Sequence, residues 1–236
     1  MTSQRRCCAA AALLCAASWA HAQAPATMPP LTPEQQRFYR IYKELVEINT
    51  THSAGSNTEA ARAMQKHLLD AGFKPEDIQL FEPFPRKGNL VVRFKGSGAK
   101  KPLLLLSHLD VVEARREDWK SDPFKLKEDD GYYTARGSSD AKSMGASFVS
   151  ILSQLKREGF QPSRDIVLAL TADEELGDVP SNGVFWLLNN QRALLEAEFG
   201  LNEGGGGQLN SGKPVLHRVQ VAEKMYTTYK LEVRDV

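Results

Sequence analysis

Histidine and acidic side chains recur in this 236-residue chain where an apolar run ends or a helix is expected to begin. They are His108 and Asp110 in "LLLLSHLD", Asp140 in "ARGSSDAKS", Asp173, Glu174 and Glu175 in "LALTADEEL", and Glu203 in "FGLNEGGGG". Short, uninterrupted apolar runs are typical of strands buried on both faces. Because open α/β sheets bind ligands at the carboxyl ends of their strands, we expect these side chains to meet at one edge of a sheet.

This set of side chains suits the chemistry of divalent cations. One imidazole with several carboxylates is a ligand set for zinc or a similar ion. An aspartate can bridge two ions, and a carboxylate that is not a ligand can take the proton of an activated water. The adjacent Glu174 and Glu175 can divide the roles of base and ligand, because neighbouring side chains diverge at a strand end.

Each cluster taken alone also has a structural interpretation. A single histidine after a strand is usually structural, "DEE" is usually a solvated acidic turn, and Asp140 can cap the helix that follows it. The glycines at 204–207 are typical of a loop, and they lack the Lys-Ser/Thr pair of a phosphate-binding loop. Only the combination of clusters favours a metal site.

The first 22 residues have the features of a secretory signal peptide. Arg5 and Arg6 precede an apolar run, and Ala20-His21-Ala22 supplies small residues for cleavage after Ala22. A lipoprotein acylated at Cys15 and an uncleaved anchor are the alternatives. We therefore expect a secreted or periplasmic protein with no membrane span after cleavage.

Composition narrows the chemistry further. All three cysteines, Cys7, Cys8 and Cys15, fall in the signal segment, so the remaining chain offers only His, Asp and Glu as metal ligands. The net charge of +1 gives no electrostatic basis for binding nucleic acid or an anionic membrane. A proline-rich tether is expected at residues 23–31.

Helices and strands are expected to alternate along the rest of the chain. The expected helices are 33–48, 58–71, 142–158 and 183–190, and the expected strands are 77–81, 89–94, 103–107, 132–135, 165–172, 198–202 and an antiparallel pair that begins near 213. Thr32 and Gln35 have the spacing of a capping box, with Pro33 at the first helical position. The alternation predicts an α/β fold with a mixed, mostly parallel sheet and helices on both faces.

A series of motifs then resembles a known family. "SHLDVV", "W…DPF", "ARGSSDAKSMGA", "TADEELG" and "NEGG", in this order and spacing, resemble the M20 metallopeptidases. These enzymes include glutamate carboxypeptidases, dipeptidases, aminoacylases and succinyl-diaminopimelate desuccinylase-like enzymes. The resemblance implies a zinc-exopeptidase-like catalytic domain over residues 32–222, with an inserted α+β lid domain that begins at 223–236.

The resemblance also implies a role for each site residue. His108 and Glu203 would bind one zinc, Asp110 would orient the imidazole, Asp140 would bridge two zinc ions, Glu175 would bind the second zinc, and Glu174 would be the general base. The Asp140–Ala141 peptide bond would be cis. Zinc is the expected metal, with cobalt or manganese as alternatives.

The function implied by the resemblance is metal-assisted hydrolysis of amide bonds. The substrates would be small peptides, and the enzyme a dipeptidase or carboxypeptidase. An N-acyl-amino-acid amidohydrolase is the main alternative, because its substrate is also an amide beside a carboxylate. An inactive metal-binding relative and a solute-binding module are further alternatives, and the presence of Glu174 disfavours the inactive one.

Two histidines of the family pattern have no counterpart among the residues of this chain. In the family, one binds the second metal and the other, from the lid, steadies the oxyanion. His52, His67 and His217 are expected to be structural or exposed. We therefore expect a weak second metal site and negligible activity for this chain alone, and a homodimer formed through the lid.

Overall fold

The computed structural model describes residues 30–222, 227 and 229–234. The chain divides into two units, Met1–Leu31 and Thr32–Val236, and the fold below belongs to the second. The expected signal peptide and most of the expected tether lie outside the described residues, as does much of the expected start of the lid. Within the described part, the longest apolar helical stretch falls short of what a membrane span requires.

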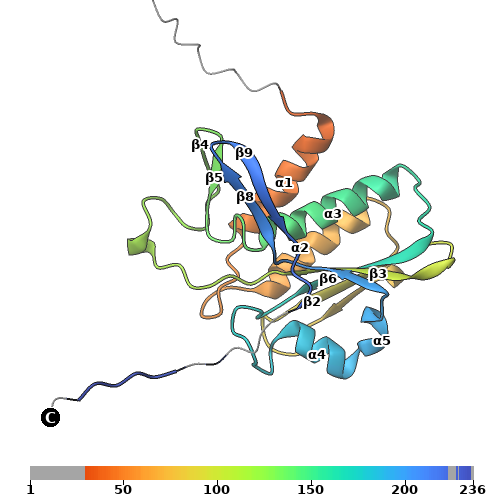
Figure 1. Cartoon of the computed structure of the whole chain (residues 1–236). Helices are drawn as coiled ribbons and strands as arrows, with labels where there is room; N and C mark the ends of the chain where they lie inside the picture. Colours follow the sequence, from red (N-terminus) through yellow and green to blue (C-terminus); the bar gives the residue numbers. More distant parts are fainter. Residues whose placement is uncertain (1–29, 223–226, 228, 235–236) are drawn as a thin grey trace, which may run out of the picture. The chain divides into compact units, whose positions relative to one another are not determined.

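A five-stranded sheet forms the centre of the second unit, in the order β1-β2-β6-β3-β7 (Figure 1). Its strands are β1 (Ile78–Phe81), β2 (Asn89–Phe94), β3 (Lys100–His108), β6 (Arg164–Thr171) and β7 (Phe199–Leu201). β3 is parallel to both β6 and β7, whereas β2 is antiparallel to β1 and β6. The predicted mixed, mostly parallel α/β sheet is therefore confirmed.

Helices cover both faces of this sheet (Figure 1). On one face lie α1 (Pro33–Glu47), α2 (Asn57–Asp70) and α3 (Lys142–Arg157), and on the other lie α4 (Gly183–Asn190) and the short α5 (Arg192–Leu195). Alternate residues of β2 show the two layers. Leu90 and Val92 are buried against the first group of helices, and Val91 is buried with Leu187 of α4. This alternation explains why the strands are apolar throughout.

Local signals in the sequence set the helix ends. The side-chain oxygen of Thr32 accepts a hydrogen bond from the backbone N–H of Gln35, and the side-chain oxygen of Gln35 accepts one from the backbone N–H of Thr32, so the predicted capping box is confirmed. The helix 183–190 begins and ends as expected. Gly72 and Gly159 follow α2 and α3 with φ of 96° and 69°, which suits glycine better than any residue with a side chain.

Two hairpins differ from expectation. β9 (Lys213–Arg218) pairs with the preceding β8 (Gly206–Asn210) and not with a later strand, and the described residues beyond 218 contain no strand. β4 (Lys127–Asp129), which was not expected, pairs with β5 (Tyr132–Thr134). The two residues that connect each pair both have positive φ, Ser211-Gly212 in one hairpin and Asp130-Gly131 in the other. Such turns favour tight hairpins between adjacent strands. The remaining elements are the 3₁₀ turns η1 (Pro75–Asp77) and η2 (Arg116–Asp118).

Candidate metal centre

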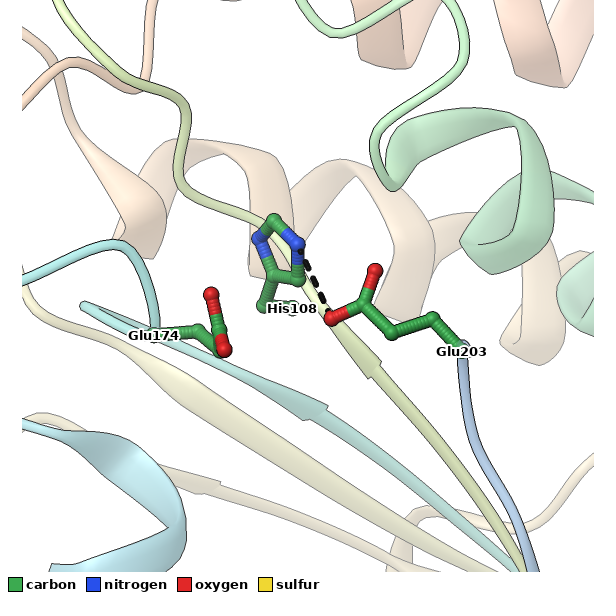
Figure 2. Close-up of side chains that lie close together, drawn as sticks. All are labelled: His108, Glu174 and Glu203. Carbon is green, nitrogen blue, oxygen red and sulfur yellow. Dashed lines mark ion pairs between the residues drawn. The ribbon is translucent and has the colours of Figure 1, made fainter. Parts of the chain in front are cut away.

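Most of the predicted site residues lie at or just after the ends of three neighbouring parallel strands, and Asp140 lies just before α3. His108 is the last residue of β3 and pairs with Thr171, the last residue of β6. Leu105 of β3 pairs with Leu201, the last residue of β7. This register brings the segments after β6 and β7 close to His108, so Glu174 and Glu203 approach it from opposite sides (Figure 2).

His108 lies at the centre of the cluster. Its side chain is buried, and Nε2 lies 3.0 Å from Oδ1 of Asp140 and 3.5 Å from Oε1 of Glu203. On the other side of the ring, Nδ1 lies 3.0 Å from the backbone oxygen of Asp110 and 3.5 Å from its carboxylate. One imidazole therefore contacts acidic residues from three separate segments.

Asp110 connects this imidazole to the loop after β6. Its carboxylate is buried and accepts hydrogen bonds from the backbone N–H of Glu174 at 3.1 Å and of Glu175 at 3.0 Å. The same carboxylate faces Nδ1 of His108. Asp110 therefore holds both the ring and the backbone that carries the two glutamates, which extends the orienting role expected for it.

The electrostatics of the cluster reflect an excess of negative charge. Burial by itself would lower the pKa of His108, but Asp110, Glu203 and Glu174 outweigh it and raise that pKa to about 10. Burial raises the pKa of Glu175 and of Glu203, and repulsion from Asp140 raises both further. Burial would also raise the pKa of Asp110, yet its hydrogen bond to His108 holds it below the ordinary value. A bound cation would relieve this repulsion.

Two sets of side chains are close enough to hold a cation. The first set is His108, Glu174 and Glu203, and the second is His108, Asp140 and Glu175. Within each set the ligand atoms lie within 4.8 Å of one another. The donors are imidazole nitrogen and carboxylate oxygen, which fit zinc and similar divalent ions. The structure thus brings together every residue predicted to bind metal, and it places Glu174 among them.

Asp140 contacts His108 and does not cap the helix that follows. The residue at the amino-terminal cap of α3 is Ala141, and no side chain caps this helix. The Asp140–Ala141 bond is cis, as the family resemblance implies. Next to it, the wholly buried Lys142 donates a hydrogen bond to the backbone oxygen of Ile48 at 2.7 Å, and burial lowers the pKa of Lys142 to about 7.

The remaining described histidines lie outside both candidate sets. His67 in α2 forms an ion pair with Glu44 of α1, and His217 is exposed in β9. His52, in the loop after α1, lies 3.1 Å from Nζ of Lys87 and 3.9 Å from the carboxylate of Asp173.

Sequence reasoning missed the pair formed by Lys87 and Asp173. It placed Asp173 in an acidic cluster without a role, and it did not consider Lys87. In the structure both side chains are buried, and Nζ of Lys87 donates a hydrogen bond to Oδ1 of Asp173 at 2.6 Å. A lysine two residues before a buried strand is a weak signal, and its partner lies 86 residues away in the sequence.

Comparison with known proteins agrees with this geometry. The sequence pattern of Peptidase family M20/M25/M40 matches residues 104–234. Aminoacylase-1 of Mus musculus is 36% identical over 166 residues, which cover 70% of this chain and 40% of the relative. A succinyl-diaminopimelate desuccinylase of Delftia acidovorans is 39% identical over 143 residues, 59% of this chain and 36% of that protein.

The fold has relatives among solved structures as well. An M20 family metallo-carboxypeptidase, Sso-CP2 from Sulfolobus solfataricus, superposes with a TM-score of 0.60 at 20% identity. The match covers 75% of this chain and 38% of that one. The fold and the cluster of His108 with acidic side chains define an α/β protein with a candidate cation site at the carboxyl ends of its parallel strands. The chain belongs to Peptidase family M20/M25/M40, and its match spans about 40% of the length of aminoacylase-1.

Proposed function

We propose that this protein is an exported metallo-hydrolase that cleaves amide bonds with two zinc ions per complete site. One observation carries the proposal. A buried imidazole, His108, meets carboxylates from the ends of β6 and β7 and from the start of α3. This arrangement has the ligand types of a zinc hydrolase and also a neighbouring carboxylate that can act as a base.

The ligand roles that the family resemblance implies are compatible with the contacts. His108 and Glu203 would hold one ion, Glu175 the other, and Asp140 would bridge them. Bound zinc would lower the pKa of the attacking water and polarise the scissile carbonyl. Asp110 would keep the imidazole oriented and the loop of Glu174 and Glu175 fixed.

Glu174 is the proposed general base. Its side chain is exposed, so a substrate can reach it, whereas its backbone N–H is held by Asp110. The carboxylate of Glu174 would take a proton from the attacking water. It would then deliver that proton to the nitrogen of the leaving amine, so that the amide yields an acid and an amine.

Two substrate classes are candidates, and both contain an amide bond beside a carboxylate. Small peptides are the first, as for the metallo-carboxypeptidase that shares the fold. N-acyl amino acids are the second, favoured by the sequence similarity to aminoacylase-1 and the desuccinylase. A panel of dipeptides and N-acetyl amino acids, assayed with the zinc-loaded product of the whole gene, separates them.

The variant Glu174→Gln tests the proposal. Introduced into the product of the whole gene, it should bind zinc as the unchanged protein does, while hydrolysis falls by about 10²–10⁴-fold because the base is lost. Glu128→Gln, at an exposed position in β4, is the matched control and should keep full activity. Full activity of Glu174→Gln would show that the base is assigned wrongly.

Isothermal titration with zinc tests the metal part. This chain supplies three ligands for the first ion, His108, Asp140 and Glu203, but only Asp140 and Glu175 for the second. We expect one tight and one weak site, and His108→Ala should abolish the tight one. Two equally tight sites would contradict the ligand assignment, and the absence of binding would contradict the proposed function.

A further inference from the structure

A buried ion pair lies behind the loop that carries Glu174 and Glu175. Nζ of Lys87 and Oδ1 of Asp173 are 2.6 Å apart, and the side chains are 6% and 1% exposed. Asp173 directly precedes Glu174 and has a φ of 56°, in the left-handed region. The pair therefore fixes a residue at the point where the chain turns out of β6 towards the candidate metal centre.

A contribution to stability does not by itself explain why this ion pair is buried. Burying two charges costs several kcal/mol per ion, so such pairs often stabilise a fold no more than apolar side chains of similar size. The second carboxylate oxygen of Asp173, Oδ2, is buried and has no hydrogen-bond partner among the described residues. Nδ1 of His52 lies 3.9 Å from this oxygen.

The same turn is held along its whole length by side chains from other segments. The amide oxygen of Asn89 accepts a hydrogen bond from the backbone of Ala172 at 3.0 Å. The amide of Asn182 donates to the backbone oxygen of Asp173 at 3.3 Å. The next two residues donate their backbone N–H groups to Asp110. Lys87 thus contacts the side chain of Asp173, while Asp110 contacts the backbone of the two residues that follow.

We propose that Lys87 and Asp173 are positioning residues, whose ion pair fixes the turn that presents Glu174 and Glu175 to His108 and Asp140. The inference rests on the proposed function, since it takes its meaning from the roles of those glutamates. Because both side chains are buried, neither is assigned a contact with the substrate. Both act through the backbone of residues 173–175, where a small displacement would misplace a base and a ligand together.

The variant Lys87→Met tests this inference, because methionine keeps an unbranched side chain, one atom shorter than that of lysine, and removes the charge. We expect zinc affinity to fall by about 10–100-fold, as is usual when a partner that orients metal ligands is lost. We also expect the visible absorption spectrum of the cobalt-substituted protein to change, because the ligand geometry at Glu175 changes. If the pair served stability alone, Lys87→Met would lower the melting temperature and leave the zinc affinity and the cobalt spectrum unchanged.

Lys95→Met is the matched control. Lys95 also contacts an aspartate, Asp77, at 2.6 Å, but at the other end of β2 and with the lysine exposed to solvent. This variant should leave zinc affinity and the cobalt spectrum as in the unchanged protein. If Lys87→Met also leaves both unchanged, the positioning role is overturned while the proposed function stands. If the unchanged protein binds no zinc, the proposed function itself fails.

A second variant covers the case in which Lys87→Met does not fold. Lys87→Met combined with Asp173→Asn removes both charges, and asparagine tolerates the left-handed backbone at residue 173. Circular dichroism is the measurement that shows whether this double variant is folded. A folded double variant with weakened zinc binding supports the inference, and one with the zinc affinity of the unchanged protein overturns it.

Discussion

At the scale of single residues, Asp110 contacts both the imidazole of His108 and the loop that carries the two glutamates. Its buried carboxylate accepts two backbone hydrogen bonds from the loop of Glu174 and Glu175 and also faces Nδ1 of His108. Charge-assisted hydrogen bonds of this kind are stronger than neutral ones. One carboxylate therefore determines the placement of two segments that meet only in the folded protein.

The substitution Asp110→Asn measures this contribution. An amide of the same shape keeps one acceptor, but its nitrogen cannot accept the second N–H, and the charge beside His108 is lost. We expect zinc affinity to fall by about 10–100-fold, measured by competition with a chelator. Asp129→Asn, at an exposed position in β4, serves as the control. Zinc affinity unchanged by Asp110→Asn would mean that the carboxylate does not orient the ligands.

At the scale of elements, the order of strands assembles the site. β3 lies between β6 and β7, so the loops after these strands converge, although His108 and Glu203 are far apart in the sequence.

At the opposite end of β6, Asp165 joins this strand to β2. It accepts hydrogen bonds from Arg93 at 2.8 Å and from the backbone of Gly96 at 2.9 Å.

This link predicts a pH-dependent contribution to stability. Burial would raise the pKa of Asp165, but the Gly96 N–H and the Arg93 guanidinium outweigh it and lower that pKa. The ionised carboxylate therefore stabilises the fold above the unfolded pKa of about 3.9. That contribution is lost as the pH falls through the lower folded value.

We expect Asp165→Asn to lower the free energy of unfolding by about 1 kcal/mol at pH 7, and the difference from the unchanged protein to shrink below pH 4. Urea denaturation at several pH values measures both effects. Asp70→Asn, which removes an exposed ion pair of α2, should change stability little. A difference that stays constant down to pH 2 would contradict the assignment.

At the scale of the whole molecule, the sheet lies between two layers of helices. α1, α2 and α3 cover one face and α4 and α5 the other, and the candidate metal ligands lie near the carboxyl ends of β3, β6 and β7 and before α3. The proposed export also concerns the chain as a whole. It rests on Arg5, Arg6, the apolar run and the small residues before Gln23.

The proposed export predicts a defined amino terminus. Expressed in a Gram-negative host, the protein should be recovered from the periplasm with Gln23 as its first residue, as amino-terminal sequencing would show. Ala22→Asp removes the small residue before the cleavage point and should leave the chain unprocessed. Full-length protein that stays in the cytoplasm without this substitution would refute the proposal.

Much of this protein follows from local patterns in its sequence. The capping box of Thr32 and Gln35, the glycines after α2 and α3, and the apolar strands 89–94 and 165–172 predict elements that the structure confirms. These features depend on neighbours within a few residues, so the chain itself displays them. Short motifs also identified the candidate site, with its residues His108, Asp140, Glu174, Glu175 and Glu203.

Only the tertiary structure decided how distant side chains combine. The pairing of β9 with β8 depends on a turn with two positive φ angles. β8 begins with glycines, which have no side chains and so give no alternating pattern that would predict a strand. The pair of Lys87 with Asp173 joins residues 86 positions apart, and a contact across that separation leaves no periodic signal. Its energy depends on burial, which follows from packing and not from residue type. For that reason the sequence by itself determined which groups could do chemistry, and the fold decided which of them touch.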